Sequence, residues 1–432
     1  VHILDFPLDE SILNGVLKPT SVQRKIKTRT NIQEGVHMAN NLQIQDQADM
    51  KLRNLLSIFN LLYDNAPISR ADLAKLSGMS PTSITRFTND IMKANLILEA
   101  PSKEKKVGRT ATLLTINKDA FYSVGINIDS TYIHVSILNF RKQIVADQYQ
   151  KIQLDSPSLN DMLEIAWQIY DQLMQESGID PEKICGIGLS VSGVMSGSDI
   201  LTHSSQLKLY GVNIRQAVID RFHQQNVIIE NDCNAAILGQ QILHPEYKEM
   251  NVACLCIGSG VGSAVSYHEY LPSQSAGLSF SEIGHTIVEP DGMLCDCGNR
   301  GCLQTFMAED ALITRAQKYN PEITLLEEIH SAWVKGIPWA KELIHQACVY
   351  TKMAINNLAC VYNPELVIIG GESIDHYWDM FQEIVEDPQI LFAPFRGRLK
   401  IVPFYKMYQS SIIGVSCQVQ EQHLNALLKN VL

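Results

Sequence analysis

The chain has 432 residues, of which 46% are hydrophobic and 19% are charged, and this length predicts two or three globular domains. No apolar run is long enough to span a bilayer, and the first residues lack a basic stretch followed by an apolar core, so we expect a cytoplasmic protein and not a membrane or secreted one. The net charge of −11 hides an asymmetry, because residues 1–120 contain 16 basic and 12 acidic residues.

The first 37 residues lack helical or strand periodicity, and the first methionine is Met38. We expect residues 1–47 to form an N-terminal extension and hypothesise that translation starts at Met38, which would make the residues before it non-native. The alternative is a basic arm that touches DNA. Its cations would be Arg24, Lys25, Lys27 and Arg29.

A pattern of three helices predicts a DNA-binding head over residues 48–117. Apolar residues recur at helical spacing in the first helix, at Leu52, Leu55, Leu56, Phe59 and Leu62. Ser69 is expected to cap a second helix that ends at Gly78, and Ser80-Pro81 to begin a third. The residues of the second helix expected to face inward are Leu73, Ala74 and Leu76. Two short helices joined by a glycine-containing turn are typical of the helix-turn-helix motif.

The exposed start of the third helix is predicted to read base edges in the major groove. The expected contacts are Ser80, Thr82, Ser83, Thr85 and Arg86. Two strands near residues 96–98 and 111–116 flank a basic hairpin tip, a wing whose Lys105, Lys106 and Arg109 are expected to grip phosphates. The basic N-terminal part of the chain agrees with a polyanionic partner, whereas the alternative is a helical protein-interaction module with a solvated lysine loop.

Beyond Asn117 the sequence alternates between buried strands and amphipathic helices. The first round comprises strands over 122–128, 133–138, 144–150, 184–190 and 227–230, a helix around 163–174, and a helix that begins at Asp232. A second round has strands over 252–257, 260–267 and 366–369. The two rounds predict two related α/β lobes with a cleft between them.

One histidine and three closely spaced cysteines give the sharpest local signal. All ten cysteines lie at or after Cys185, most of them scattered in apolar segments, so a disulfide framework is not expected. His285, Cys295, Cys297 and Cys302 supply one imidazole and three thiolates, a set that suits tetrahedral Zn2+. Because no coordination position stays open, we expect a structural zinc ion. The alternative is a group of unrelated free thiols.

Several of these motifs resemble those of the ROK family, which comprises transcription repressors and sugar kinases. Residues 295–302 are similar to the family's Cys-x-Cys-Gly-x-x-Gly-Cys signature, and residues 281–285 to its Gly-Glu-Ile-Gly-His segment except at the first position. Residues 69–86 and Gly108-Arg109 resemble the head of the NagC/Mlc/XylR repressor branch. The resemblance runs from about Met50 to the C-terminus.

The resemblance implies an α/β chain in which an N-terminal winged helix-turn-helix precedes a two-lobed, actin-like sugar-kinase fold. The first lobe is expected over residues 118–245, completed by a C-terminal helix at about 408–432. The second lobe, with the zinc site, is expected over residues 246–407.

The family's sugar site can be carried over onto matching positions of this sequence. Glu230-Asn231-Asp232 matches a segment whose Asn contacts sugar hydroxyls and whose Asp is the base of the kinases. The alternative for Asp232 is a simple helix cap. The expected sugar contacts are Gly193, Asn231, Asp232, Glu282, His285 and Gln304.

Departures from the family pattern weaken the kinase interpretation. Residues 127–131 stand where the kinases have the phosphate-gripping Asp-x-Gly-Gly-Thr, so the leading Asp is Asn127, both glycines are replaced, and Asp129 adds a negative charge. Glycine-rich segments survive at 258–262 and 370–371. Gln304 replaces a family Glu, Gln206 an Asn and Tyr210 a Trp, which leaves the identity of the sugar open.

We therefore expect a non-enzymatic, dimeric or tetrameric transcription regulator, a repressor of sugar genes that binds operator DNA and responds to a sugar. Phosphoryl transfer depends on positioning and charge neutralisation, which the altered segment would impair. One alternative is a working ATP-dependent sugar kinase with a regulatory head. Another is a repressor controlled by a protein partner such as a sugar-transport component.

Overall fold

The computed structural model describes residues 50–101, 112–152, 158–267, 282–386, 388–404 and 406–431. The chain divides into two units, Val1–Asn54 and Leu55–Leu432. Nearly all described residues belong to the second unit, and only the start of the helix over residues 50–65 lies in the first. No helix of the described ranges combines the length and the apolar character that crossing a membrane requires.

The head begins with this helix and continues with β1 (Ile68–Ser69), α2 (Arg70–Ser77), α3 (Pro81–Lys93), β2 (Ile97–Pro101) and β3 (Thr112–Ile116). The predicted caps are confirmed: Ser69 accepts a hydrogen bond from the Asp72 amide, and Ser80 from the Ser83 amide. Both serines thereby satisfy an amide that the helix itself leaves unpaired. The three strands form one sheet in the order β1-β3-β2.

The three helices of the head bury a shared apolar core that includes Leu62, Leu73, Ile84 and Ile91. One expectation for α2 is wrong, because the side chain of Leu76 is 56% exposed. Leu76 lies three residues after Leu73, so helical spacing alone places both on one face. However, α2 has only eight residues, and its buried residue is Leu73. The wing tip with Lys105, Lys106 and Arg109 lies outside the described residues.

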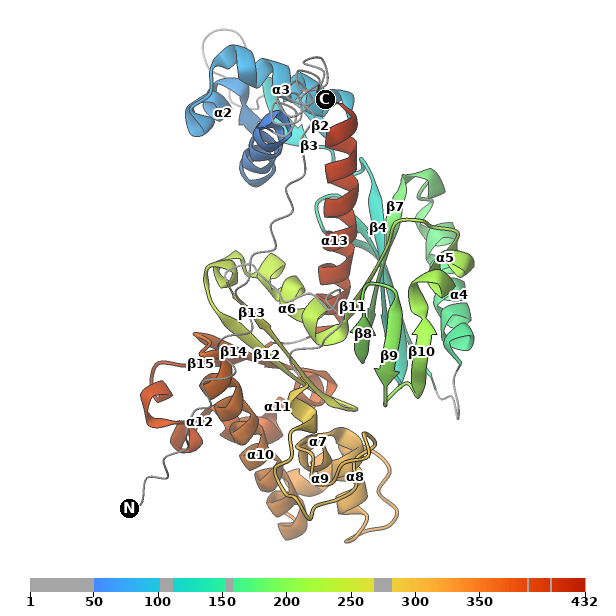
Figure 1. Ribbon diagram of the computed structural model, residues 1–432, viewed down its shortest axis with the longest axis vertical. Helices are drawn as coiled ribbons and strands as arrows, with labels where there is room; N and C mark the ends of the chain where they lie inside the picture. The colour runs from blue at the N-terminus through green and yellow to red at the C-terminus, as the bar shows by residue number, and fades with distance from the viewer. Residues whose placement is uncertain are drawn as a thin grey trace, which may run out of the picture. The chain divides into compact units, whose positions relative to one another are not determined.

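The first lobe is built on a five-stranded sheet in the order β11-β7-β4-β5-β6. Its strands are β4 (Tyr122–Ile128), β5 (Tyr132–Asn139), β6 (Ile144–Lys151), β7 (Ile184–Val191) and β11 (Val227–Asn231). The helices α4 (Leu159–Ser177) and α5 (Ile214–Phe222) cover one face of this sheet, and α13 (Met407–Asn430) covers the other (Figure 1). A second, three-stranded sheet, β10-β9-β8, was not predicted. It comprises β8 (Val194–Ser196), β9 (Ile200–Ser204) and β10 (Leu209–Asn213).

The second lobe contains a four-stranded sheet in the order β13-β12-β14-β15. Its strands are β12 (Val252–Ile257), β13 (Val261–Ser266), β14 (Leu366–Gly370) and β15 (Lys400–Pro403). Alternate residues of β12 face opposite sides: Cys254 and Cys256 pack with α6 (Asp232–Leu243), whereas Leu255 and Ile257 enter the helical layer. That layer contains α7 (Gln304–Met307), α8 (Glu309–Ala316), α9 (Leu326–Val334), α10 (Pro338–Tyr362), α11 (Glu372–Phe381) and α12 (Glu383–Glu386). Single 3-10 turns lie at Pro181–Lys183, Pro245–Glu249, Ile283–His285, Pro388–Ile390 and Ala393–Phe395.

Helices α6 and α13 pack directly on each other, α13 packs on the first-lobe sheet, and α6 contacts strands of both sheets. Their backbones touch at two glycines: a Cβ on Gly414 would lie 2.0 Å from the Ala235 carbonyl oxygen, and one on Gly239 would lie 1.9 Å from the Ser410 oxygen. Only glycine allows so close an approach. The pair α6–α13 therefore forms a tightly packed connection between the lobes.

Candidate functional site

A cavity of about 180 Å³ lies between the two sheets and is lined by residues of both lobes. Every residue predicted to contact sugar lines it, namely Gly193, Asn231, Asp232, Glu282, His285 and Gln304. The fold thus brings together residues from both lobes that are distant in the sequence, from Gly193 to Gln304. Their binding of a sugar stays a prediction.

The end of β11 and the start of α6 position two of these groups. The Asn231 side-chain oxygen caps α6 by accepting hydrogen bonds from the Cys233 and Asn234 amides at 3.0 and 3.2 Å. Its amide nitrogen donates to the Gly193 carbonyl at 3.2 Å. Gly193 has φ of +130°, and a Cβ there would lie 2.5 Å from the His203 carbonyl oxygen, so this turn requires glycine. Asn231 therefore fixes the relative position of the turn and of the helix start.

The Asp232 carboxyl lies in the cavity and accepts a hydrogen bond from the Cys233 amide at 2.8 Å. Burial raises its pKa to about 6, and the negative charges of Asp129 and Glu282 act in the same direction. A carboxylate with a raised pKa is a better acceptor for the proton of a sugar hydroxyl. The N-cap residue of α6 is Asn231, and the Asp232 carboxyl accepts a hydrogen bond from the same Cys233 amide, so the helix-cap alternative for Asp232 stays open.

The side of the cavity that corresponds to the altered phosphate segment carries Asn127, Asp129 and Ser259. Asp129 accepts hydrogen bonds from the Thr131 amide at 2.9 Å, from the Thr131 hydroxyl at 2.7 Å and from the Ser259 hydroxyl at 3.3 Å. Ser259 belongs to the glycine-rich segment of the second lobe. The Asp129 carboxylate therefore joins the segment after β4 to the glycine-rich segment between β12 and β13, whose correspondence with the phosphate-binding segments of the kinases stays a prediction.

His285, Cys295, Cys297 and Cys302 converge, and their four ligand atoms all lie within 4.8 Å of one another. The Cys295 Sγ lies 3.6 Å from the His285 Nδ1, and the Cys297 Sγ lies 3.6 Å from the Cys302 Sγ. A tetrahedral ion with metal–sulfur bonds of about 2.3 Å requires sulfur–sulfur distances of about 3.8 Å, so the donor set fits a metal ion. Gln304 donates from its amide to the Cys295 sulfur at 3.4 Å, which connects this cluster to the cavity.

Helix α3 presents the predicted DNA contacts on the surface of the head. Thr82, Thr85 and Arg86 are exposed, and Ser83 is half-buried. Ser80 is used as the helix cap, and the Thr85 hydroxyl donates to the Pro81 carbonyl at 2.9 Å. The Arg86 guanidinium lies over the Phe87 ring at 4.9 Å. Their contacts with DNA stay a prediction.

The head is joined to the first lobe by an aromatic cluster, the joint, formed by Phe59, Tyr63, Phe121, Phe140 and His423. Phe140 stacks with Phe59 at 5.7 Å between ring centroids and contacts Phe121 at 4.3 Å. The Phe121 ring in turn meets the imidazole of His423 on α13 at 4.9 Å. The joint thus connects the first helix of the head to the C-terminal helix of the body.

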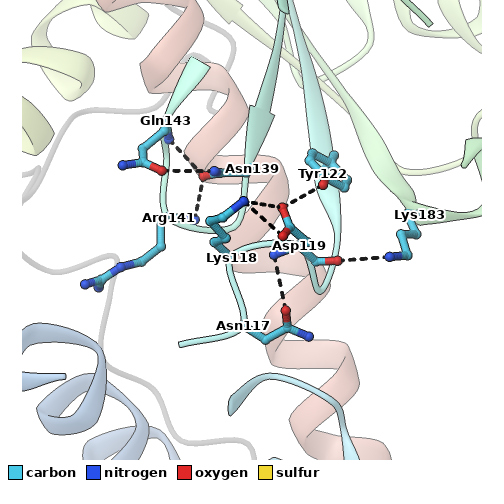
Figure 2. A network of polar contacts seen from close by, with 8 residues as sticks. All are labelled: Asn117, Lys118, Asp119, Tyr122, Asn139, Arg141, Gln143 and Lys183. Atoms are coloured by element: carbon cyan, nitrogen blue, oxygen red, sulfur yellow. Dashed lines mark hydrogen bonds and ion pairs between the residues drawn. The ribbon is translucent and has the colours of Figure 1, made fainter. Parts of the chain in front are cut away.

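Polar contacts hold the linker after β3 and the turn between β5 and β6 (Figure 2). The Asp119 carboxylate accepts hydrogen bonds from the Tyr122 hydroxyl at 2.8 Å and from the Lys118 ammonium at 3.0 Å. Lys183 donates to the Asp119 carbonyl at 3.3 Å. From the other side, Arg141 donates to the Tyr63 carbonyl at 2.7 Å, and its guanidinium lies over the Tyr63 ring.

Comparison with protein families gives a match over most of the body. Residues 123–421 match the ROK family, and residues 52–97 match a winged helix-turn-helix DNA-binding family. The chain belongs to the ROK family. It has the two parts that the sequence predicted, a winged helix-turn-helix and a ROK body.

Curated relatives of this ROK chain include the xylose repressor of Bacillus subtilis (strain 168), which is 25% identical over 78% of this chain and 86% of the relative. The xylose repressor of Caldicellulosiruptor bescii is 28% identical over 77% of this chain and 86% of the relative. The DNA-binding transcriptional repressor Mlc of Escherichia coli (strain K12) is 23% identical over 74% of this chain and 81% of the relative.

Two kinds of ROK structure share the fold. A ROK family transcriptional regulator, described as a homolog of E. coli MLC, superposes with a TM-score of 0.72 at 22% identity over 88% of this chain and 99% of the other. A ROK glucokinase from Streptomyces griseus, in complex with glucose and AMPPNP, gives a TM-score of 0.60 at 19% identity over 69% of this chain and 98% of the glucokinase. The alignment with the regulator covers the larger share of this chain.

Sequence reasoning missed several cavity residues of this ROK body. Glu372, at the start of α11, follows the glycines at 370–371, and that position was the one available signal for it. Tyr408 and Ser411 reach the cavity from α13, which is distant in sequence from the other lining segments. Gln206 lines the cavity, whereas Tyr210 is exposed and its ring contacts His203.

Proposed function

We propose that this chain is a DNA-binding repressor of sugar-metabolism or sugar-uptake genes and that a sugar in the cavity controls it. The observation that carries the proposal is the presence, in one chain, of a winged helix-turn-helix and of a cavity lined by Asn231, Asp232, Glu282 and His285. These four residues match the family's sugar-side positions, whereas the phosphate side is altered at Asn127 and Asp129. Relatives that align with 78% and 74% of this chain are named xylose repressor and DNA-binding transcriptional repressor Mlc, which supports the same function.

The proposed signal starts at α6 and passes through α13 to the head. Ser411 on α13 donates to the Asp232 carbonyl at 3.1 Å, and the glycine contact between the two helices follows a few residues further along. A helix of 24 residues is about 36 Å long, so α13 spans the distance from the cavity to the joint at His423. A displacement of α6 by a bound sugar would therefore be transmitted to Phe140 and Tyr63.

On this proposal the parts of the chain have separate roles. Residues 48–117 form the DNA-binding domain, residues 118–245 with 408–432 the first lobe, and residues 246–407 the second lobe. Two heads of a homodimer bind two half-sites of an operator, and the sugar favours a geometry that does not fit them. Coupling of this kind is typically worth about 1–3 kcal/mol, or about 5–150-fold in affinity.

The ion held by the His/Cys cluster is proposed to be a structural zinc ion. Three thiolates and one imidazole fill a tetrahedral shell, which leaves no open position for a substrate or water. The ion would hold residues 285–302 in the conformation that places His285 and Gln304 at the cavity. It takes no part in a chemical step.

A second function, sugar kinase activity, is favoured by one observation, since Asn231 and Asp232 keep the places of the family's sugar-side residues. An assay of ATP consumption with a panel of hexoses and pentoses tests it. Turnover that is lost in an Asp232→Asn variant would establish the enzyme. We expect no turnover above background, because Asp129 already occupies the donors of the two phosphate segments.

The proposed function is tested by operator binding. Genomic fragments selected by the purified chain are measured by fluorescence anisotropy, with and without each sugar, at fixed salt. We expect specific binding that one sugar weakens at least fivefold, and that an Arg86→Ala variant weakens by about 1–3 kcal/mol. A chain that binds no duplex from its own genome more tightly than random DNA refutes the proposal.

A further inference from the structure

The Asp129 carboxylate occupies the hydrogen-bond donors of the former phosphate side. Its two oxygens take both donors of Thr131 and the hydroxyl of Ser259, so the segments from the two lobes close on an internal anion. Charged acceptors form stronger hydrogen bonds than neutral ones, and a phosphate oxygen would have to displace the carboxylate to reach these donors.

The cavity around Asp129 has the charge that disfavours a second anion. Four carboxylates line it, from Asp129, Asp232, Glu282 and Glu372, and none of the described lining residues is Lys or Arg. Burial raises the pKa of the Glu372 carboxyl, and the charge of Asp129 acts in the same direction. The basic side chains that lower the pKa of Glu372, those of His376 and Lys151, do not line the cavity.

Two buried polar atoms among the lining residues have no hydrogen-bond partner within the described part of the chain. They are the side-chain oxygen of Asn127, whose residue is 3% exposed, and the hydroxyl of Ser192, whose residue is 8% exposed. A buried polar atom without a hydrogen-bond partner costs folding free energy. A ligand hydroxyl can donate to the Asn127 oxygen, and a ligand hydroxyl can also pair with the Ser192 hydroxyl. A phosphate, which lacks donors when fully ionised, cannot pair with the Asn127 oxygen.

We infer that the effector is an unphosphorylated sugar and that Asp129 is the residue that excludes sugar phosphates and nucleotides. The inference rests on the proposed function, since it names the chemical class of the sugar that acts there. Neutral hydroxyl groups meet a cavity rich in acceptors, whereas a phosphate group meets four carboxyl groups and, among the described lining residues, no Lys or Arg. Repulsion between like charges in a partly buried site amounts to roughly a tenfold loss of affinity or more per close pair.

The test compares sugars with their own phosphates by isothermal titration of the full-length, metal-loaded chain. The probes are glucose, N-acetylglucosamine and xylose against glucose 6-phosphate and N-acetylglucosamine 6-phosphate, with ADP as the nucleotide. We expect the tightest parent sugar to bind at least tenfold more tightly than any phosphorylated probe. A phosphorylated probe that binds as tightly as the parent sugars overturns the inference and leaves the proposed function intact.

An Asp129→Asn variant tests the assigned residue, since Asn keeps an oxygen that accepts from Thr131 but removes the charge. We expect the preference for the parent sugar over its phosphate to shrink about tenfold, whereas Glu322→Gln, which removes one exposed charge outside the cavity lining, leaves it unchanged. An unchanged preference in Asp129→Asn overturns the assignment.

The native chain offers a check that needs no variant. Raising the salt concentration from about 50 to 500 mM should reduce the preference for the parent sugar, because salt screens repulsion between charges. A preference that does not move with salt counts against the electrostatic origin. If no probe of either kind binds, the sugar control in the proposed function is refuted together with the inference.

Discussion

Replacing Arg141 by alanine should weaken the transmission of a sugar signal to the head. The change removes the hydrogen bond from Arg141 to the Tyr63 carbonyl at 2.7 Å and the contact of the guanidinium with the Tyr63 ring at 4.9 Å. A hydrogen bond from a charged donor contributes about 1.5–3 kcal/mol, and an exposed cation–π contact about 0.5–1 kcal/mol. Because the pair is half-buried, we take the lower values and expect the joint to lose about 2 kcal/mol.

A loss of this size matches the coupling of about 1–3 kcal/mol that sugar control requires. The assay measures operator affinity by anisotropy with and without the sugar, and sugar affinity by titration. We expect sugar binding by Arg141→Ala to be normal and the effect of sugar on operator affinity to fall below about threefold.

Arg221→Ala is the matched control, since Arg221 contacts the Glu164 carboxylate at 2.9 Å and the Trp167 ring at 4.3 Å within the first lobe, outside the joint. It should keep the native response to sugar. If Arg141→Ala retains full coupling, the joint does not carry the signal and the proposed route through α13 is wrong.

Three further changes probe the metal cluster, the cavity and the contact between helices. Cys297→Ala should lose the bound ion in mass spectrometry of metal content and lower the melting temperature by roughly 5 °C or more, whereas full metal content would contradict the assigned ligand. Asp232→Asn should raise the free energy of unfolding at pH 8 by at most about 3 kcal/mol, measured by urea unfolding. The pKa of the Asp232 carboxyl rises from 3.8 to about 6 on folding, so above pH 6 the folded chain holds a buried carboxylate that destabilises it, and the amide removes this charge. This gain should vanish below about pH 4, and a gain independent of pH would exclude the raised pKa as its cause. Gly414→Ala should cost about 1–3 kcal/mol of stability, since its methyl group would overlap the Ala235 carbonyl, and unchanged thermal unfolding would show that α6 and α13 can separate freely.

The parts of the structure that the sequence predicted well are those encoded by local chemistry. The caps at Ser69 and Ser80 depend on residues within three positions, and the His/Cys cluster depends on one short glycine-rich loop and a nearby histidine. Buried strands such as β4 and β7 were found because long runs of apolar residues leave little choice of structure.

The parts that were missed depend on partners distant in sequence. Strand β8 has three residues and β15 has four, which is too short for a pattern to emerge. The partnerless oxygen of Asn127 and the contribution of Tyr408 to the cavity follow from how separate segments meet in space. Leu76 was misplaced because an eight-residue helix buries one narrow stripe, and spacing alone does not say which apolar residue falls outside it.

Helix α13 covers a sheet whose strands are all synthesised before the second lobe. Gln420 on α13 donates to the Ser123 hydroxyl in β4 at 2.9 Å, 297 positions earlier, and the α13 backbone lies directly on Gly125 and Gly188 of β4 and β7. During synthesis one face of the first-lobe sheet therefore stays uncovered until α13 has left the ribosome, and its apolar surface is exposed to aggregation while the second lobe is being made. A chain that stops before α13 would lack this covering layer altogether, so premature termination even this late in the sequence should yield insoluble protein and not a repressor with reduced activity.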